Sequence, residues 1–189
     1  MIKTTIHNER LLHLRTFLKQ INLDGFLIPL TDKYHSEFPP ANARRLHWLT
    51  GFNGSAGVAV VLLNSASIFV DGRYILQVRT EVDISLFSPY LVPEKSLDSW
   101  LKKHAPEKKI GYDPWLHTTA YLDQLKKRLE NSGISLVAVE QNPIDQIWKD
   151  RPKSPSGLAY IYDNKMAGKT SAQKRTEISE ILVRENADA

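Results

Sequence analysis

The sequence predicts an α/β domain with a mixed β-sheet and helices on both sides of it. Apolar residues at helical spacing alternate along the chain with short apolar segments of strand length. Segment 58–63 is apolar at every position, as a strand covered on both faces requires. Residues 64–66 turn this segment into 67–70 as a hairpin, so the sheet cannot be wholly parallel.

The first helix is expected over residues 10–21, where apolar side chains recur at helical spacing and form one stripe. Asn8 is predicted to cap it, because an asparagine side chain can accept a free backbone N–H. Asp24 and Gly25 then break the chain. A short buried strand should follow at 26–28 and end at Pro29.

The remaining elements continue the alternation. Helices or helical turns are expected at 44–49, 74–82, 97–101, 121–129 and 142–148. Strands are expected at 58–63, 67–70, 84–91, 109–112 and 134–139. Glycines at 51 and 133 are typical of the chain breaks that follow two of these helices.

The composition indicates a domain boundary near residue 157. Residues 151–157 are rich in proline and small polar residues, as inter-domain linkers are. We therefore expect one domain over 1–157 and the start of a second, truncated one over 158–189, with a strand at 160–162 and a capped amphipathic helix at 171–184. About thirty residues cannot bury a core of their own. The chain is either an excised piece of a longer protein or a truncated gene product, and its end inside an expected domain start favours the piece.

Composition also restricts the function. There is no cysteine, which excludes disulfides, thiolate metal sites and a cysteine nucleophile. The net charge is +4, but the cations are scattered and no nucleic-acid motif accompanies them, so we expect a solvated surface and no nucleic-acid partner. No apolar run is long enough to span a bilayer, and the first ten residues do not resemble a secretory signal. These features predict a cytoplasmic protein without a membrane partner.

The densest local pattern is the glycine-rich segment 48–57. Three glycines in seven residues suggest a phosphate-binding loop, but they precede a strand instead of opening a helix, and no Lys-Ser or Lys-Thr follows. Ser55 also lacks the strand before and helix after it that a nucleophile elbow requires. We expect a turn packed tightly against the sheet.

A second pattern, Asp71-Gly-Arg-Tyr74, lies where a strand should end and a helix begin. Asp71 is placed to cap that helix, and Gly72 to free the turn. Arg73 would project from the strand end, where α/β proteins often place ligand contacts, and its guanidinium could hold a carboxylate or carbonyl of a substrate. The alternative is a salt bridge within the domain, and the spacing does not decide between them.

Two groups of residues are candidate metal ligands. Asp113, His117 and Asp123 lie within eleven residues of one another, and His35 and Glu37 form a second pair. A hydrolytic site needs convergent carboxylates and imidazoles, and nothing later in the chain completes either group. Asp113 is expected instead to cap a turn before a proline.

Several motifs in order resemble one protein family. They are Asp32-Lys-Tyr-His-Ser-Glu-Phe38, Arg44-Arg45, Thr50-Gly-Phe-Asn-Gly-Ser-Ala-Gly57, Asp71-Gly-Arg-Tyr74, Gly111-Tyr-Asp113 and the segment 142–152. The chain resembles the amino-terminal domain of Xaa-Pro aminopeptidases, the long three-domain form of aminopeptidase P, from about residue 8 to its end. The glycine-rich motif and the Asp-Gly-Arg-Tyr motif are more typical of that form than of prolidase or creatinase.

The resemblance implies a creatinase-type amino-terminal fold, followed by a similar second domain and a pita-bread catalytic domain. In the family, two manganese or similar ions are held in that last domain by two Asp, one His and two Glu, and a metal-activated water cleaves the bond before proline. None of those ligands falls in the matched region, so no catalytic or metal residue is assigned here and the chain alone should be inactive. The family's arginine that reaches the peptide substrate corresponds to Arg73. Members commonly form homodimers.

Two other functions remain possible at this stage. The same fold occurs without catalysis as a protein-binding module in a histone-chaperone subunit, which an acidic carboxy-terminal tail and lost metal ligands in the parent would favour. An unrelated small-molecule-binding α/β domain would require the whole series of motifs to be coincidence.

Overall fold

The computed structural model describes residues 6–188 and divides the chain into two compact units. The first unit ends at Ser154 and the second begins at Pro155. Within residues 6–188, none of the helices combines the length and the apolar character that crossing a bilayer requires.

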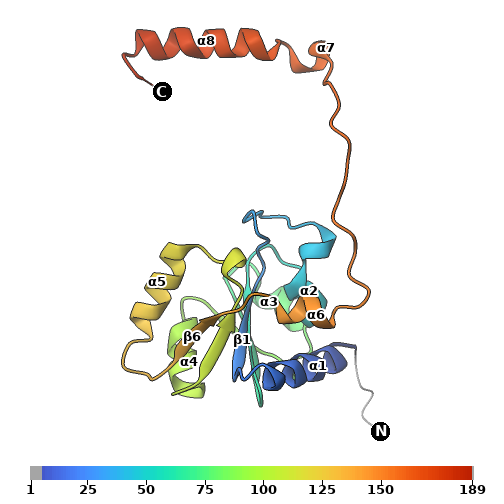
Figure 1. The fold of residues 1–189 in the computed structure, drawn as a ribbon, viewed down its shortest axis with the longest axis vertical. Helices are drawn as coiled ribbons and strands as arrows, with labels where there is room; N and C mark the ends of the chain where they lie inside the picture. The colour runs from blue at the N-terminus through green and yellow to red at the C-terminus, as the bar shows by residue number, and fades with distance from the viewer. Residues whose placement is uncertain (1–5, 189) are drawn as a thin grey trace. The chain divides into compact units, whose positions relative to one another are not determined.

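The first unit contains a six-stranded sheet and six α-helices among its described residues (Figure 1). The strands are β1 (Gly25–Pro29), β2 (Val58–Leu62), β3 (Ala66–Val70), β4 (Ser88–Leu91), β5 (Lys109–Tyr112) and β6 (Ser135–Ala138). The helices are α1 (Ile6–Gln20), α2 (Arg45–Thr50), α3 (Ile75–Glu81), α4 (Leu97–His104), α5 (Thr119–Arg128) and α6 (Pro143–Ile147). Short 3-10 helices occupy Ala41–Ala43 and Pro114–Leu116.

The sheet is mixed, as predicted, with the strand order β4-β3-β2-β1-β5-β6. Strand β2 pairs antiparallel with both β1 and β3, and the other neighbouring strands pair in parallel. All strands except β2 therefore run in the same direction. Their carboxyl ends meet at one edge of the sheet, together with the beginning of β2.

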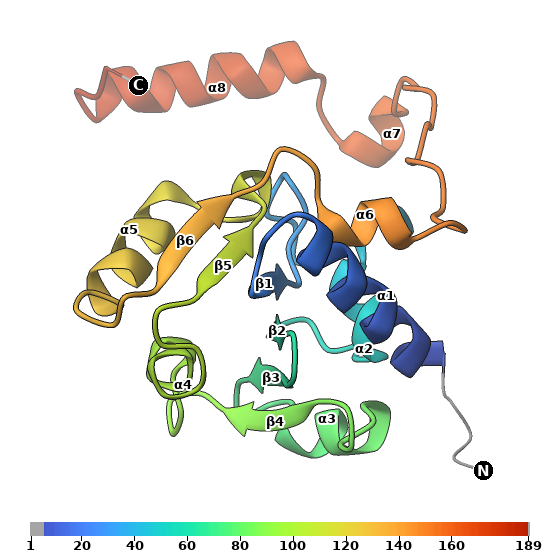
Figure 2. The same ribbon diagram turned by 60° about the horizontal axis from the view of Figure 1, so that its bottom comes forward.

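Helices cover both faces of the sheet and form two hydrophobic cores. Figure 2 shows α4 and α5 on one side and α1 and α2 on the other. The central strands alternate between the cores: Phe26 and Ile28 contact the first, and Leu27 contacts the second. In β2, Val61 contacts the first core and Val60 contacts the second. This double burial explains why the strand is apolar at every position.

Three local predictions were wrong. The first helix begins at Ile6, so Asn8 lies inside its first turn and does not cap it. Of the segment predicted as a strand at 84–91, only 88–91 pairs with β3, because residues 84–87 form the turn that follows α3. Residues 160–162 are irregular and exposed, because no neighbouring strand pairs with them.

The second unit contains α7 (Asn164–Ala167) and α8 (Ser171–Arg184). Helix α8 spans the predicted residues and begins with a capping box, in which Thr170 and Gln173 each accept a backbone N–H from the other. None of residues 155–188 is buried. This unit has no core of its own within the described chain, and the two-domain assignment stays a prediction.

Limited proteolysis should separate the two units. Trypsin is expected to cut first at Lys153, Lys165 and Lys169, because exposed segments without buried contacts open at little cost in free energy. Lys126 and Lys127 are equally exposed but lie in α5, which packs on the sheet, and serve as matched sites that should resist. Mass spectrometry should find a stable fragment ending at Lys153, because Pro152 prevents cleavage after Arg151. If residues 155–188 resisted trypsin as well as the first unit does, the division into two independent units would be contradicted.

Candidate substrate-contact site at the carboxyl edge of the sheet

The glycine-rich segment and the Asp-Gly-Arg-Tyr motif meet at the carboxyl edge of the sheet. The first immediately precedes β2 and the second immediately follows β3, its antiparallel neighbour. The Ser55 hydroxyl lies 2.6 Å from the Tyr74 hydroxyl and joins the two motifs by a hydrogen bond. The Phe52 and Tyr74 rings also meet edge to face, with centroids 5.7 Å apart. In α/β proteins this edge is the usual place for ligand contacts.

Close packing explains the glycines of this turn. Gly51 ends α2 with φ of +83°, a left-handed conformation that glycine adopts without a steric penalty. A Cβ at Gly54 would lie 2.7 Å from the Tyr74 ring. The predicted tightly packed turn is thus confirmed, and the Ser55 hydroxyl serves to hold Tyr74.

The Asp71-Gly72-Arg73 segment forms a tight turn before α3. The Asp71 carboxylate accepts a hydrogen bond from the Arg73 backbone N–H at 3.0 Å. The helix starts only at Ile75, with Tyr74 at its N-cap position, so the prediction that Asp71 caps the helix was wrong. Gly72 has no left-handed φ, and a Cβ there would meet nothing within 4 Å. The turn itself therefore does not require a glycine, contrary to the sequence-based expectation.

Arg73 is held by Asp71 but remains open to solvent. Its Nη2 lies 2.7 Å from Asp71 Oδ2, and its Nε donates to the same carboxylate at 3.1 and 3.2 Å. The hydrogen bonds and charge of Asp71 raise the pKa of Arg73, and Arg73 in turn lowers the pKa of Asp71. The Arg73 side chain is still 63% exposed.

The guanidinium also lies over the Tyr74 ring, 5.1 Å from its centroid. Among residues 6–188 its Nη1 has no hydrogen-bond partner. Arg73 does form a salt bridge within the domain, with Asp71. Because this pair is exposed and joins residues two positions apart, it contributes little to the stability of the fold. Arg73 therefore presents free N–H groups in a fixed orientation to whatever faces this edge.

The structure does not bring the other weighed residues together as metal ligands. Asp113 caps the turn before Pro114, as predicted, by accepting the Trp115 backbone N–H at 3.0 Å. His117 is buried, Asp123 is exposed, and His35 and Glu37 line different pockets. Within the part of the chain that the structure describes, no three His, Asp or Glu side chains form a group suited to a metal ion.

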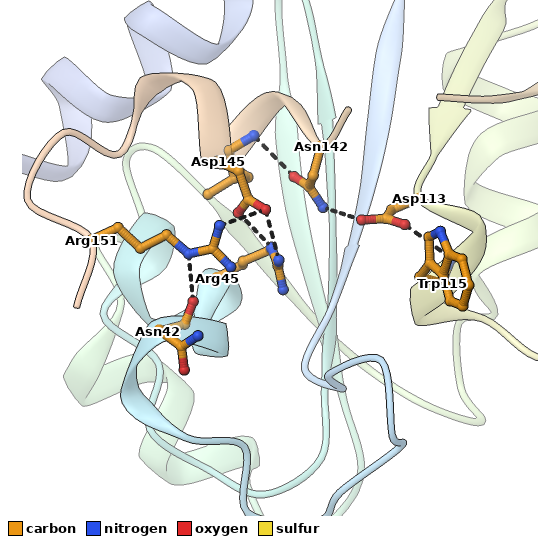
Figure 3. Close-up of polar contacts among 8 residues, drawn as sticks. Asn42, Arg45, Asp113, Trp115, Asn142, Asp145 and Arg151 are labelled. Atoms are coloured by element: carbon orange, nitrogen blue, oxygen red, sulfur yellow. Dashed lines mark hydrogen bonds and ion pairs between the residues drawn. The ribbon is translucent and has the colours of Figure 1, made fainter. Parts of the chain in front are cut away.

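Several other residues of the shared motifs form an internal polar network (Figure 3). Arg45, in α2, donates from Nε and Nη2 to the two Asp145 carboxylate oxygens at 2.8 Å each. Arg151 Nη1 lies 2.7 Å from Asp145 Oδ2, and Asn142 donates to Asp113 at 2.9 Å. These contacts tie the end of the first unit to α2 and β5. No sequence pattern links Arg45 to Asp145, because the two residues are 100 positions apart.

The motif residues thus divide into two groups with different roles. The first group stabilises the fold through hydrogen bonds inside the first unit, from Arg45 to Asp145 and from Asn142 to Asp113. Asp71 and Arg73 lie at the exposed carboxyl edge, where their side chains pair with each other and the guanidinium lies over the neighbouring Tyr74 ring. Arg73 is the motif residue best placed to contact a ligand or another domain.

Comparison with known proteins identifies the same fold and family. The family model of the creatinase/prolidase N-terminal domain matches residues 10–147. A protein of Talaromyces marneffei, "Probable Xaa-Pro aminopeptidase P", is 34% identical over 96% of this chain. A Penicillium rubens protein of the same name is 34% identical over 93%. The chain spans 28% and 29% of the length of these two relatives.

Solved structures with the same fold include two proteins of this kind. The X-prolyl aminopeptidase of Caenorhabditis elegans, described as a cytosolic enzyme with a di-nuclear active site, matches 97% of this chain with a TM-score of 0.79 and 27% identity. The chain covers 32% of that structure. The N-terminal domain of the cytoplasmic peptidase PepQ from Mycobacterium tuberculosis matches with a TM-score of 0.56 at 24% identity, which shows a shared fold.

The mixed sheet, the two covering helix layers and the family match over 10–147 lead to one conclusion. The chain belongs to the creatinase/prolidase N-terminal domain family.

Proposed function

We propose that this chain is the non-catalytic amino-terminal part of an Xaa-Pro aminopeptidase. The observation that carries the proposal is its relatedness along almost its whole length to proteins of that name, of which it spans less than a third. The parent enzyme would remove the N-terminal residue from peptides with proline in the second position.

In this proposal the metal ions belong to a part of the parent outside this chain. Residues 6–188 offer no group of three ligands, so they do not fit a hydrolytic metal centre. The two ions, manganese by resemblance to the family, would activate the attacking water in the catalytic domain. This chain contributes Arg73, whose solvent-facing N–H groups would hold a carbonyl or carboxylate of the peptide. The parent is proposed to act in the cytoplasm as a homodimer, without nucleic-acid or membrane partners.

Peptide hydrolysis by the full-length parent and by the 189-residue chain tests this function. With manganese added, the parent should release the first residue of a tripeptide with proline in second position, and not that of a matched tripeptide with alanine there. The 189-residue chain should cleave neither peptide, because residues 6–188 contain no group of three ligands that could hold a water-activating metal ion.

Two results would count against the proposal. One is chelator-sensitive cleavage by the purified chain that persists after a contaminating peptidase has been excluded. The other is a parent that binds no metal and cleaves neither peptide, which would favour a protein-binding module of the same fold.

A further inference from the structure

A cavity of about 430 Å³ lies at the carboxyl edge of the sheet and has Asp71 in its wall. Its volume is in the range of about 300–1,000 Å³ that is usual for small-molecule sites. The walls come from the ends of β1 and β3, the start of β2 and the turn before α5. Most of them are apolar, and the apolar lining includes Pro29, Val58, Phe69, Val70, Val92 and Leu116.

The lining favours an apolar occupant. Val92 is 40% exposed and Tyr121 is 37% exposed, so the cavity presents apolar surface to water, and covering that surface is favourable. Two polar side chains of the lining are already engaged. The Thr31 hydroxyl donates to the Leu116 carbonyl at 3.0 Å, and the Thr118 hydroxyl accepts the Tyr121 backbone N–H at 3.2 Å.

A charged group with free donors lies beside this cavity. Asp71, in the cavity wall, binds Arg73, whose Nη2 is 2.7 Å from Asp71 Oδ2. The Arg73 side chain is 63% exposed, and its Nη1 has no hydrogen-bond partner among residues 6–188. A guanidinium with free N–H groups can hold a carboxylate or a carbonyl oxygen. This edge therefore places an apolar cavity next to a group that binds acidic or carbonyl oxygens.

We propose that the cavity is a specificity subsite for the peptide, which takes an apolar side chain of the residue after proline while Arg73 holds the carbonyl or carboxylate of that residue. The inference rests on the proposed aminopeptidase function. The first residue and proline flank the bond that is cut, so they must lie at the catalytic centre, outside this chain. The third residue is the first that is free to reach this edge. It combines an apolar side chain with a backbone oxygen, and the cavity and Arg73 match these two features.

Binding of tripeptides to the metal-depleted full-length parent tests the subsite without turnover. Isothermal titration calorimetry should show Ala-Pro-Leu binding roughly tenfold to a hundredfold more tightly than Ala-Pro-Gly, the usual effect of burying one leucine side chain. Ala-Pro-Asn should bind no more tightly than Ala-Pro-Gly, because its side chain is about as large as leucine but carries an amide that apolar walls cannot pair. With manganese added, kcat/KM should follow the same order.

Two variants locate the preference in the cavity. Ala56→Phe places a ring in the cavity from its wall and should bring the affinities for Ala-Pro-Leu and Ala-Pro-Gly close together. Ala138→Phe makes the same change at an exposed position of β6 that does not line the cavity, and should keep the preference for leucine. Arg73→Ala should weaken both peptides alike, because both carry the carboxylate.

Two outcomes would overturn the subsite. The first is an equal affinity of the wild-type parent for Ala-Pro-Leu and Ala-Pro-Gly, which decides the question even if Ala56→Phe does not fold. The second is a preference for leucine that folded Ala56→Phe retains, because the side chain would then bind elsewhere. A parent that prefers Ala-Pro-Leu in binding but cuts none of the three peptides with manganese would support the subsite and contradict the aminopeptidase function.

Discussion

The substitution Asp145→Ala should destabilise the first unit by about 3 kcal/mol, near the lower end of the cost of breaking a buried ion pair. It would leave Arg45, whose side chain is 9% exposed, buried without its carboxylate. Arg151 would lose the same partner. Urea unfolding followed by tryptophan fluorescence measures the effect, because Trp48 and Trp148 stack beside this network with centroids 5.2 Å apart.

A matched control is available in α4. Asp98 also pairs with an arginine, Arg128, but at 3.6 Å and with the arginine side chain 56% exposed. Asp98→Ala should therefore cost less than about 1 kcal/mol, as exposed pairs do. Replacing both Arg45 and Asp145 by Met and Leu should recover much of the loss, because the buried arginine charge is removed and only the partly exposed Arg151 is left without its carboxylate. A cost for Asp145→Ala no larger than that for Asp98→Ala would show that the network does not hold the fold.

Local sequence patterns predicted most of the fold. The hairpin of β2 and β3 followed from an unbroken apolar run and a polar turn, and both strands formed where expected. The start of β4 was harder to predict, because the apolar residues of segment 84–91 are also compatible with the turn that follows α3. The cap assigned to Asn8 failed because helix α1 begins two residues earlier. A single sequence gives weak information on such boundaries.

The site was predictable only in part. The Asp71–Arg73 turn lies within one short motif, so its place at a strand end could be inferred from neighbouring residues. Arg45 and Asp145 are 100 residues apart in the chain, and no local pattern links them. The sequence suggested His117 only as a metal ligand, because the side chains around it come from three strands and a helix that are distant along the chain.

If Arg73 contacts the substrate, Arg73→Ala in the full-length parent should reduce kcat/KM for an Xaa-Pro peptide by roughly tenfold to a hundredfold. This is the usual effect of losing one charge-assisted hydrogen bond. The unfolding midpoint should stay close to that of the wild type, because the Arg73–Asp71 pair is exposed. Arg73→Lys should recover only part of the activity, since an ammonium cannot reproduce the planar fork. Arg79→Ala removes the same charge from the exposed face of α3 and should leave activity unchanged.

Measuring kcat/KM and the unfolding midpoint on one preparation of Arg73→Ala distinguishes a substrate contact from a structural role. A substrate contact predicts a large loss of kcat/KM at an unchanged midpoint. A lowered midpoint with full activity of the enzyme that remains folded would contradict it, and would make the arginine a structural residue.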